Sequence, residues 1–466
     1  MHKATPPNTY KFIYRALVAW AFYLAYSRSA EMYITVDEAM TYIDHVLPKT
    51  GLLDFSAANN HFLNTLLVKG FTFLAPYSEL SMRLPSLLVG LWFFWQYLPR
   101  KILNTTVLII TASFCLAPTY ISEYWSLSRG YFMSGCFASA CLLEIITNKA
   151  DKPGEESSRL LWYGALTTLS SFAMLPFSFS INAYYFLTSG KTWKKRLSNT
   201  FKRIDFWFMQ FSLVLSFVAI RTFQTSGEAL SKAKSMTLLS PIDAILNTPI
   251  IGNAGLAMGF SLIFGAGSLV SIFVLRGRTA KAAAILFISL ILLYLSGALT
   301  GGYPTGRSWI PYWFPISVIS GNIFHLRLFD KKAIYSSISV FLACLAYGFS
   351  SILTYTPHYT HYWRSNDYQV KALMFHSANG KIQCLEDRDQ GDKVLMFYWD
   401  DPKSAIVRPP GCKESEKSPL GFSNFDVPAK PYELPRKIYG KYDNSTHTGW
   451  YIDTIMAPKN EHSEQF

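Results

Sequence analysis

The chain has 466 residues, of which 50% are apolar, 16% are aromatic and only 16% are charged. Soluble domains carry about 25% charged residues, so this composition indicates a membrane protein and excludes a disordered chain, a collagen-like repeat and a small disulfide scaffold. The mean hydropathy is only +0.17, which indicates a long water-soluble stretch beside the apolar part.

Apolar runs of about 17–25 residues are long enough to cross a bilayer. Residues 1–355 contain about eleven such runs, with two short ones counted on either side of Pro176. We predict a polytopic α-helical membrane protein with spans at residues 11–29, 83–98, 104–122, 130–147, 160–176, 177–190, 205–222, 250–275, 282–300, 310–326 and 333–354. The first run begins with basic residues but lacks a clear small-residue cleavage site, so we expect a retained span.

The net charge of +13 divides unevenly along the chain. Residues 357–466 hold 14 basic and 15 acidic residues, so the rest of the chain carries a net charge of +14. An isoelectric point near 9.2 is also typical of proteins that bind nucleic acid. Basic loops between spans give the same value, and the location of the charge favours that interpretation over a nucleic-acid partner.

The basic residues predict the orientation of the spans. They cluster in five connections, at residues 100–101, 149–159, 191–203, 276–281 and 327–332. Positive loops stay cytoplasmic, and all five can do so only if residues 61–77 do not cross the membrane. We therefore expect residues 30–82 to form one long external loop, with surface helices around 37–47 and 61–76.

Residues 356–466 are predicted to form a small external soluble domain, α/β or mostly β. Its segments 393–399 and 450–457 are apolar and rich in aromatic residues, as strands are. Cys384 and Cys412 could form a disulfide in an oxidising compartment. Two cysteines alone form no spacing pattern, so the sequence leaves open whether they are bonded.

The first external loop contains two adjacent acids, Asp37 and Glu38, about eight residues after the first span. A carboxylate at the membrane surface that faces a cavity can act as a general base. The same two residues would also favour the first turn of a helix. Their position alone leaves both interpretations open.

Further polar residues follow on the external side. Asn60 and His61 precede an apolar helix, where they would either cap the helix or contact a substrate headgroup. Arg83, Arg129 and Arg307 lie outside, against the positive-inside trend. Each alone is either an interfacial residue or a phosphate ligand, since a guanidinium fork matches phosphate oxygens. Together with the acidic pair they predict a site for a negatively charged lipid headgroup.

These motifs resemble those of the C-type glycosyltransferases, which have the GT-C fold and include protein O-mannosyltransferases and lipid A aminoarabinose transferases. Over residues 10–150 the order and spacing agree for Asp37-Glu38, Asn60-His61-Phe62-Leu63, Arg83-Leu84-Pro85-Ser86 and Ser128-Arg129-Gly130-Tyr131. Two positions depart from the family pattern. Phe62 replaces the usual proline, and Gly130 stands where proline or threonine is common.

The resemblance implies an enzyme that moves a sugar from a polyprenyl-phosphate donor to an acceptor glycan, lipid or protein at the outer face of the membrane. It implies that Asp37 is the catalytic base, with Glu38 beside it in the same site. Arg83 and Arg129 match arginines that are plausible ligands of the donor phosphate. Arg307 is assigned to that role only from its external, glycine-rich setting.

For substrate binding, the resemblance implies contacts from Asn60, His61 and Tyr131. No cofactor is required beyond the lipid-linked donor. Some members of the family use a divalent metal, and no cluster of ligands with metal-binding spacing indicates one here.

The expected location is a bacterial inner membrane with a periplasmic tail, or the endoplasmic reticulum membrane with a lumenal one. The alternative function is a transporter or flippase for a lipid-linked or anionic solute, and a third is a non-catalytic assembly subunit. Charges within the spans are few, chiefly Glu144, and no duplicated halves are visible, which favours the enzyme over the transporter.

Overall fold

The computed structural model describes residues 8–31, 34–48, 51–55, 60–76, 78–116, 123–147, 159–190, 192–225, 277–300, 309–323, 397, 423–426 and 448–451. The chain divides into two compact units. The bundle unit comprises Met1–Ser27, Phe55–Asn64 and Leu84–Tyr355, and the loop unit comprises Arg28–Asp54, Thr65–Arg83 and Thr356–Phe466. The predicted division of the chain at residue 355 stays a prediction.

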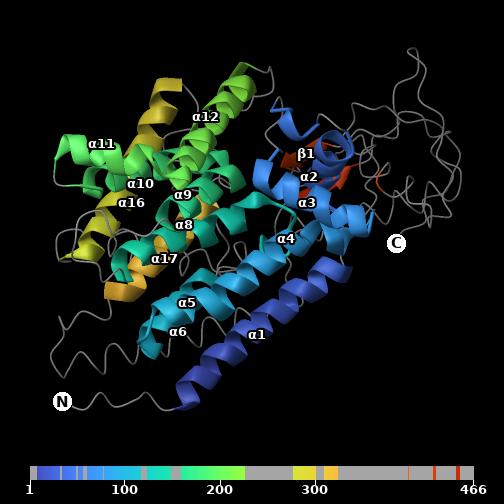
Figure 1. Ribbon diagram of the computed structural model, residues 1–466. Helices are drawn as coiled ribbons and strands as arrows, with labels where there is room; N and C mark the ends of the chain where they lie inside the picture. Colours follow the sequence, from blue (N-terminus) through green and yellow to red (C-terminus); the bar gives the residue numbers. More distant parts are fainter. Residues whose placement is uncertain are drawn as a thin grey trace, which may run out of the picture. The chain divides into compact units, whose positions relative to one another are not determined.

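The first third of the chain is helical, as its apolar runs predict. Its elements are α1 (Asn8–Glu31), α2 (Val36–Met40), the π-helix η1 (Thr41–Val46), the 3-10 turn η2 (Gly51–Leu53), α3 (Phe62–Leu74), α4 (Glu79–Leu91), the π-helix η3 (Trp92–Tyr97), α5 (Leu98–Lys101) and α6 (Thr105–Leu116) (Figure 1). Helices exist at both positions predicted for surface helices, one as α2 with η1 and the other as α3. Their place at the membrane surface stays a prediction, because α3 with 13 residues is no shorter than α9 with 12, which lies in a predicted span.

The second part of the described chain continues the helical pattern. Its elements are α8 (Gly130–Thr147), α9 (Arg159–Ser170), the 3-10 turn η4 (Phe172–Met174), α10 (Leu175–Thr188), α11 (Trp193–Phe201), α12 (Ile204–Thr225), α16 (Arg278–Thr300) and α17 (Ile310–Ile323). Apart from α11, which lies within the predicted connection 191–203, each begins or ends within a few residues of a predicted boundary. The predicted spans 250–275 and 333–354 lie outside the described residues.

Three helices of the described ranges are both long and apolar enough to cross a membrane: Gly130–Thr147, Ile204–Phe223 and Arg278–Ser296. The protein is therefore a helical protein with several apolar helices, and the count of eleven spans stays a prediction. In the tail, β1 (Ser423–Asp426) pairs antiparallel with β2 (Thr448–Tyr451), which overlaps the predicted strand 450–457. Cys384 and Cys412 lie outside the described residues.

Helix α8 lies at the centre of the bundle unit. In its membrane-length window 89% of the residues are buried, compared with 28% for α12 and 33% for α16. Helices α9 and α17 pack against α8, and α10, α12 and α16 surround them (Figure 1). Exposed apolar side chains on α12 and α16, such as Phe217 and Ile288, are suited to contact lipid, because hydrocarbon tails favour apolar faces.

Glycines allow the central helices to approach closely. A Cβ on Gly135 of α8 would lie 2.5 Å from the Phe314 ring of α17, and one on Gly321 of α17 would lie 2.1 Å from the Thr111 hydroxyl of α6. Small residues at helix contacts are the usual means of packing in membranes, where no hydrophobic force drives helices together.

The charged residue Glu144 inside α8 has two polar partners. The Glu144 carboxylate accepts a hydrogen bond from the Tyr97 hydroxyl at 2.7 Å and pairs with the Lys101 ammonium at 2.9 Å. Charged side chains in spans are costly unless they are paired. The cluster joins the predicted cytoplasmic ends of α5 and α8.

The tightest approach is at the start of α8, where a Cβ on Gly130 would stand 1.8 Å from the Ser170 carbonyl oxygen at the end of α9. A backbone atom cannot turn away as a side chain can. Overpacking of this kind costs about 1–3 kcal/mol. We therefore expect Gly130→Ala to lower the midpoint of thermal unfolding of the purified protein.

The matched control is Gly70→Ala in α3, where a Cβ meets nothing within 4 Å. It should be neutral or stabilise the protein by up to about 1 kcal/mol, because glycine is unfavourable inside a helix. Equal effects of the two substitutions would contradict the close approach of α8 and α9.

Candidate functional site

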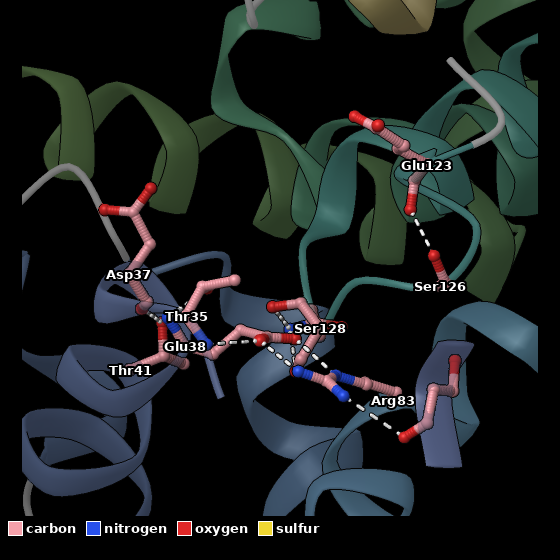
Figure 2. A network of polar contacts seen from close by, with 10 residues as sticks. Thr35, Asp37, Glu38, Thr41, Arg83, Glu123, Ser126 and Ser128 are labelled. Carbon is pink, nitrogen blue, oxygen red and sulfur yellow. Dashed lines mark hydrogen bonds and ion pairs between the residues drawn. The ribbon is translucent and has the colours of Figure 1, made fainter. Parts of the chain in front are cut away.

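The loop unit holds a capping box at the start of α2. The Thr35 hydroxyl accepts a hydrogen bond from the Glu38 amide at 3.3 Å, and the Glu38 carboxylate accepts one from the Thr35 amide at 3.0 Å (Figure 2). This reciprocal arrangement satisfies two amides that a helix start leaves unpaired. It also fixes the rotamer of Glu38.

The same carboxylate forms a bidentate ion pair with Arg83 of α4. Arg83 Nε donates to Oε1 at 3.0 Å and Nη2 donates to Oε2 at 2.8 Å, while Nη1 donates to the Ser29 carbonyl at 3.1 Å. Both side chains are 0% exposed. Bidentate charge-assisted pairs are short and directional, so this pair links α2 to α4 in one geometry.

Asp37 differs from its neighbour Glu38. Its side chain is half-buried rather than fully buried, and Figure 2 shows the carboxylate directed away from Arg83. Its backbone carbonyl accepts a hydrogen bond from the Thr41 hydroxyl at 2.8 Å, which continues the helix. Of the two predicted catalytic acids, Glu38 is therefore held in the capping box and the ion pair, whereas Asp37 lies outside both.

The bundle unit holds a second group of polar residues, which we name the α8 cluster: His61, Asn64, Ser128, Arg129, Tyr131 and Ser170. His61 Nδ1 lies 3.1 Å from the Ser170 carbonyl oxygen. A carbonyl only accepts, so Nδ1 carries the proton and a neutral ring has its lone pair at Nε2. The imidazole also meets the Tyr131 ring edge to face, with centroids 4.5 Å apart.

Arg129 lies directly before α8 and is 3% exposed. Its guanidinium carbon stands 5.6 Å from the centre of the Tyr131 ring, within the range of a cation–π interaction. The Ser86 hydroxyl donates to the Arg129 carbonyl at 3.3 Å. The predicted residues His61, Arg129 and Tyr131 are thus brought together within one unit.

Sequence reasoning missed Asn64, whose amide donates to the Ser128 carbonyl at 3.1 Å and to its hydroxyl at 3.3 Å. Asn64 lies in the first turn of α3, four residues after the buried Asn60 that precedes the helix, so its closeness in sequence to the predicted pair Asn60 and His61 was the available signal. Glu123, a buried acid on the connection before α8, was also missed. Arg307 lies outside the described residues. Among the described residues, no group of three His, Cys, Asp or Glu side chains could hold a metal ion.

The Glu38–Arg83 pair predicts a specific pattern of stability. Arg83→Met would leave a buried, unpaired carboxylate, and breaking such a pair costs about 3–5 kcal/mol. The double variant Arg83→Met/Glu38→Gln removes both charges and should recover much of that loss. Thermal unfolding of both variants in the same detergent tests this, and a single variant as stable as the parent would refute it.

Comparison with solved structures identifies a similar fold. The crystal structure of ArnT from Cupriavidus metallidurans bound to undecaprenyl phosphate matches 97% of this chain and 99% of its own, with a TM-score of 0.55 and 9% sequence identity. The structure of that protein in the apo state matches 80% of this chain and 71% of its own, with a TM-score of 0.44 and 11% identity. No family model and no curated protein matches the sequence. The chain therefore shares the fold of this ArnT structure, in agreement with the resemblance that its motifs predicted.

Proposed function

We propose that this protein is a membrane glycosyltransferase that moves a sugar from a polyprenyl-phosphate donor to an acceptor at the outer face of the membrane. The observation that carries the proposal is the match of 97% of the chain to a solved structure that holds undecaprenyl phosphate. The motif residues add to it: Asp37 of the first external loop is the acid, and Arg129 and Arg307 are the cations, that such a transfer needs.

In the proposed step, the Asp37 carboxylate takes a proton from an acceptor hydroxyl or amine. The freed lone pair attacks the anomeric carbon of the sugar. The bond from that carbon to the phosphate oxygen breaks, and polyprenyl phosphate leaves with its electron pair. The role of base falls to Asp37 rather than Glu38, because the Glu38 carboxylate already accepts from Thr35 and Arg83. Glu38 then acts by holding the helix that carries Asp37.

The leaving phosphate gains negative charge as the bond breaks, and preorganised cations stabilise that charge. We assign this role to Arg129 and Arg307. Arg83 could contribute only with the N–H groups that are not directed at Glu38 and Ser29. In this proposal the main role of Arg83 is to hold the Glu38 carboxylate in place.

Asn60, His61 and Tyr131 are proposed substrate contacts. The His61 Nε2 lone pair, set by the bond from Nδ1 to the Ser170 carbonyl, suits a hydrogen bond from a sugar or acceptor hydroxyl. Residues 356–466 are proposed to lie on the same outer side, in the periplasm of a bacterial inner membrane.

A transporter receives less support. Glu144, the acidic residue inside α8, is engaged by Tyr97 and Lys101 at the predicted cytoplasmic end. Transporters use ionisable groups near the bilayer midplane, and this pairing gives Glu144 a structural role instead.

The proposal predicts that Asp37→Asn lowers the rate of sugar transfer by about 10²–10⁴-fold, the usual contribution of a general base. The unfolding temperature should stay the same, because Asp37 lies outside the buried ion pair. Transfer from radiolabelled polyprenyl-phosphate sugars by the purified variant measures the loss.

Asp44→Asn serves as the matched control, since Asp44 is a half-buried acid in the neighbouring helix η1. It should retain the parental rate. The assignment of Asp37 would be lost if its variant, still folded, transferred sugar as fast as the parent.

A further inference from the structure

Helix α11 is predicted to lie at a membrane surface. It connects α10 to α12, and α12 begins at Ile204, where an apolar segment long enough to cross the membrane starts. The connection 191–203 is the most basic of the predicted cytoplasmic loops. Since positive loops stay inside, we expect α11 at the cytoplasmic face, opposite the face proposed for sugar transfer.

The helix is fixed to the ends of its neighbours rather than loosely attached. Asn199 Nδ2 donates to the Ser189 carbonyl at 2.7 Å, and the Thr200 hydroxyl donates to the Ser189 hydroxyl at 3.1 Å. Arg196 Nε donates to the Gly190 carbonyl at 2.7 Å. The outer face of α11 is therefore presented in one orientation.

That outer face is basic. Residues 192–205 include five basic residues and one acid. The acid, Asp205, pairs with Arg203 at 2.7 Å, so it offsets one of the five charges. Lys194, Lys195 and Lys202 are exposed. The face attracts anions.

Two exposed tryptophans flank these lysines. Trp193 is 61% exposed at the start of α11, and Trp207 is 53% exposed in the first turn of α12. Tryptophan is enriched where headgroups meet hydrocarbon, because its ring is apolar and its N–H is polar. A basic helix flanked by such rings is suited to a lipid surface and not to a soluble anion.

A concavity of about 340 Å³ opens beside this face, lined by Tyr185, Ser189, Ser198, Asn199, Lys202 and Arg203. Hydroxyl, amide, ammonium and guanidinium groups are the donors that bind phosphate oxygens. The concavity lies between the C-terminal end of α11 and the end of α10, beside the start of the span.

We propose that α11 and this concavity form a binding site for the headgroup of an anionic phospholipid of the cytoplasmic leaflet. The phosphate is held by Lys202 and the Ser198 hydroxyl, and Lys194 and Lys195 contact the surrounding anionic surface. Trp193 and Trp207 lie at the headgroup level. The site is separate from the proposed donor site, and its occupant is a structural or regulatory lipid.

Native mass spectrometry of the full-length protein in detergent, titrated with phosphatidylglycerol, tests the proposal. A basic residue that contacts an anionic headgroup strengthens binding about fivefold, so Lys194→Gln/Lys202→Gln should weaken phosphatidylglycerol binding about 25-fold. Lys194→Arg/Lys202→Arg should retain it. Both lysines are exposed, so the unfolding temperature should not change.

Arg100→Gln/Lys281→Gln is the matched control, because these exposed residues lie in two other basic connections. It should change the affinity by less than twofold, and phosphatidylcholine should bind weakly to every variant. Equal affinity of the Lys194/Lys202 variant and the parent would overturn the proposal. Displacement of phosphatidylglycerol by an equal concentration of inorganic phosphate would also overturn it, since the site would then belong to a soluble anion.

Discussion

The buried bidentate pair between Glu38 and Arg83 is the interaction on which the proposed chemistry depends. It joins residues 45 positions apart, and both side chains are fully buried. Removing two charges from water is costly, so such a pair is favourable only when further hydrogen bonds satisfy its remaining polar groups. The Thr35 amide of the capping box donates one to the carboxylate, and the Ser29 carbonyl accepts one from the guanidinium. As a result, the start of α2 is held in place. Asp37 lies there with its carboxylate directed away from Arg83.

In the bundle unit, too, hydrogen bonds hold polar side chains in place, and there the acceptors are backbone carbonyls. The Ser170 carbonyl sets the tautomer of His61, and it can do so because Gly130 leaves room for the end of α9. The departure of Gly130 from the family pattern thus has a physical reason. A larger residue at that position would occupy the space of the Ser170 oxygen.

The sequence predicts the helices well, because their apolar runs are long and the loops between them are basic. The placement of charge also predicts that residues 61–77 do not cross the membrane, and α3 lies at the predicted position. The pairing of Glu38 with Arg83 and of His61 with Ser170 could not be predicted. Those contacts join residues 45 and 109 positions apart, and no local pattern encodes them. Adjacent acids look alike in sequence, and only the tertiary pairing separates Glu38 from Asp37.

The central claim is that the protein breaks the bond between a sugar and polyprenyl phosphate. The most direct measurement is the release of free polyprenyl phosphate from a polyprenyl-phosphate sugar by the purified protein in lipid vesicles, with acceptor lipids or glycans present. We expect the release of polyprenyl phosphate to equal the sugar gained by the acceptor. Movement of intact donor across the vesicle membrane, without release of polyprenyl phosphate, would contradict it and indicate a transporter.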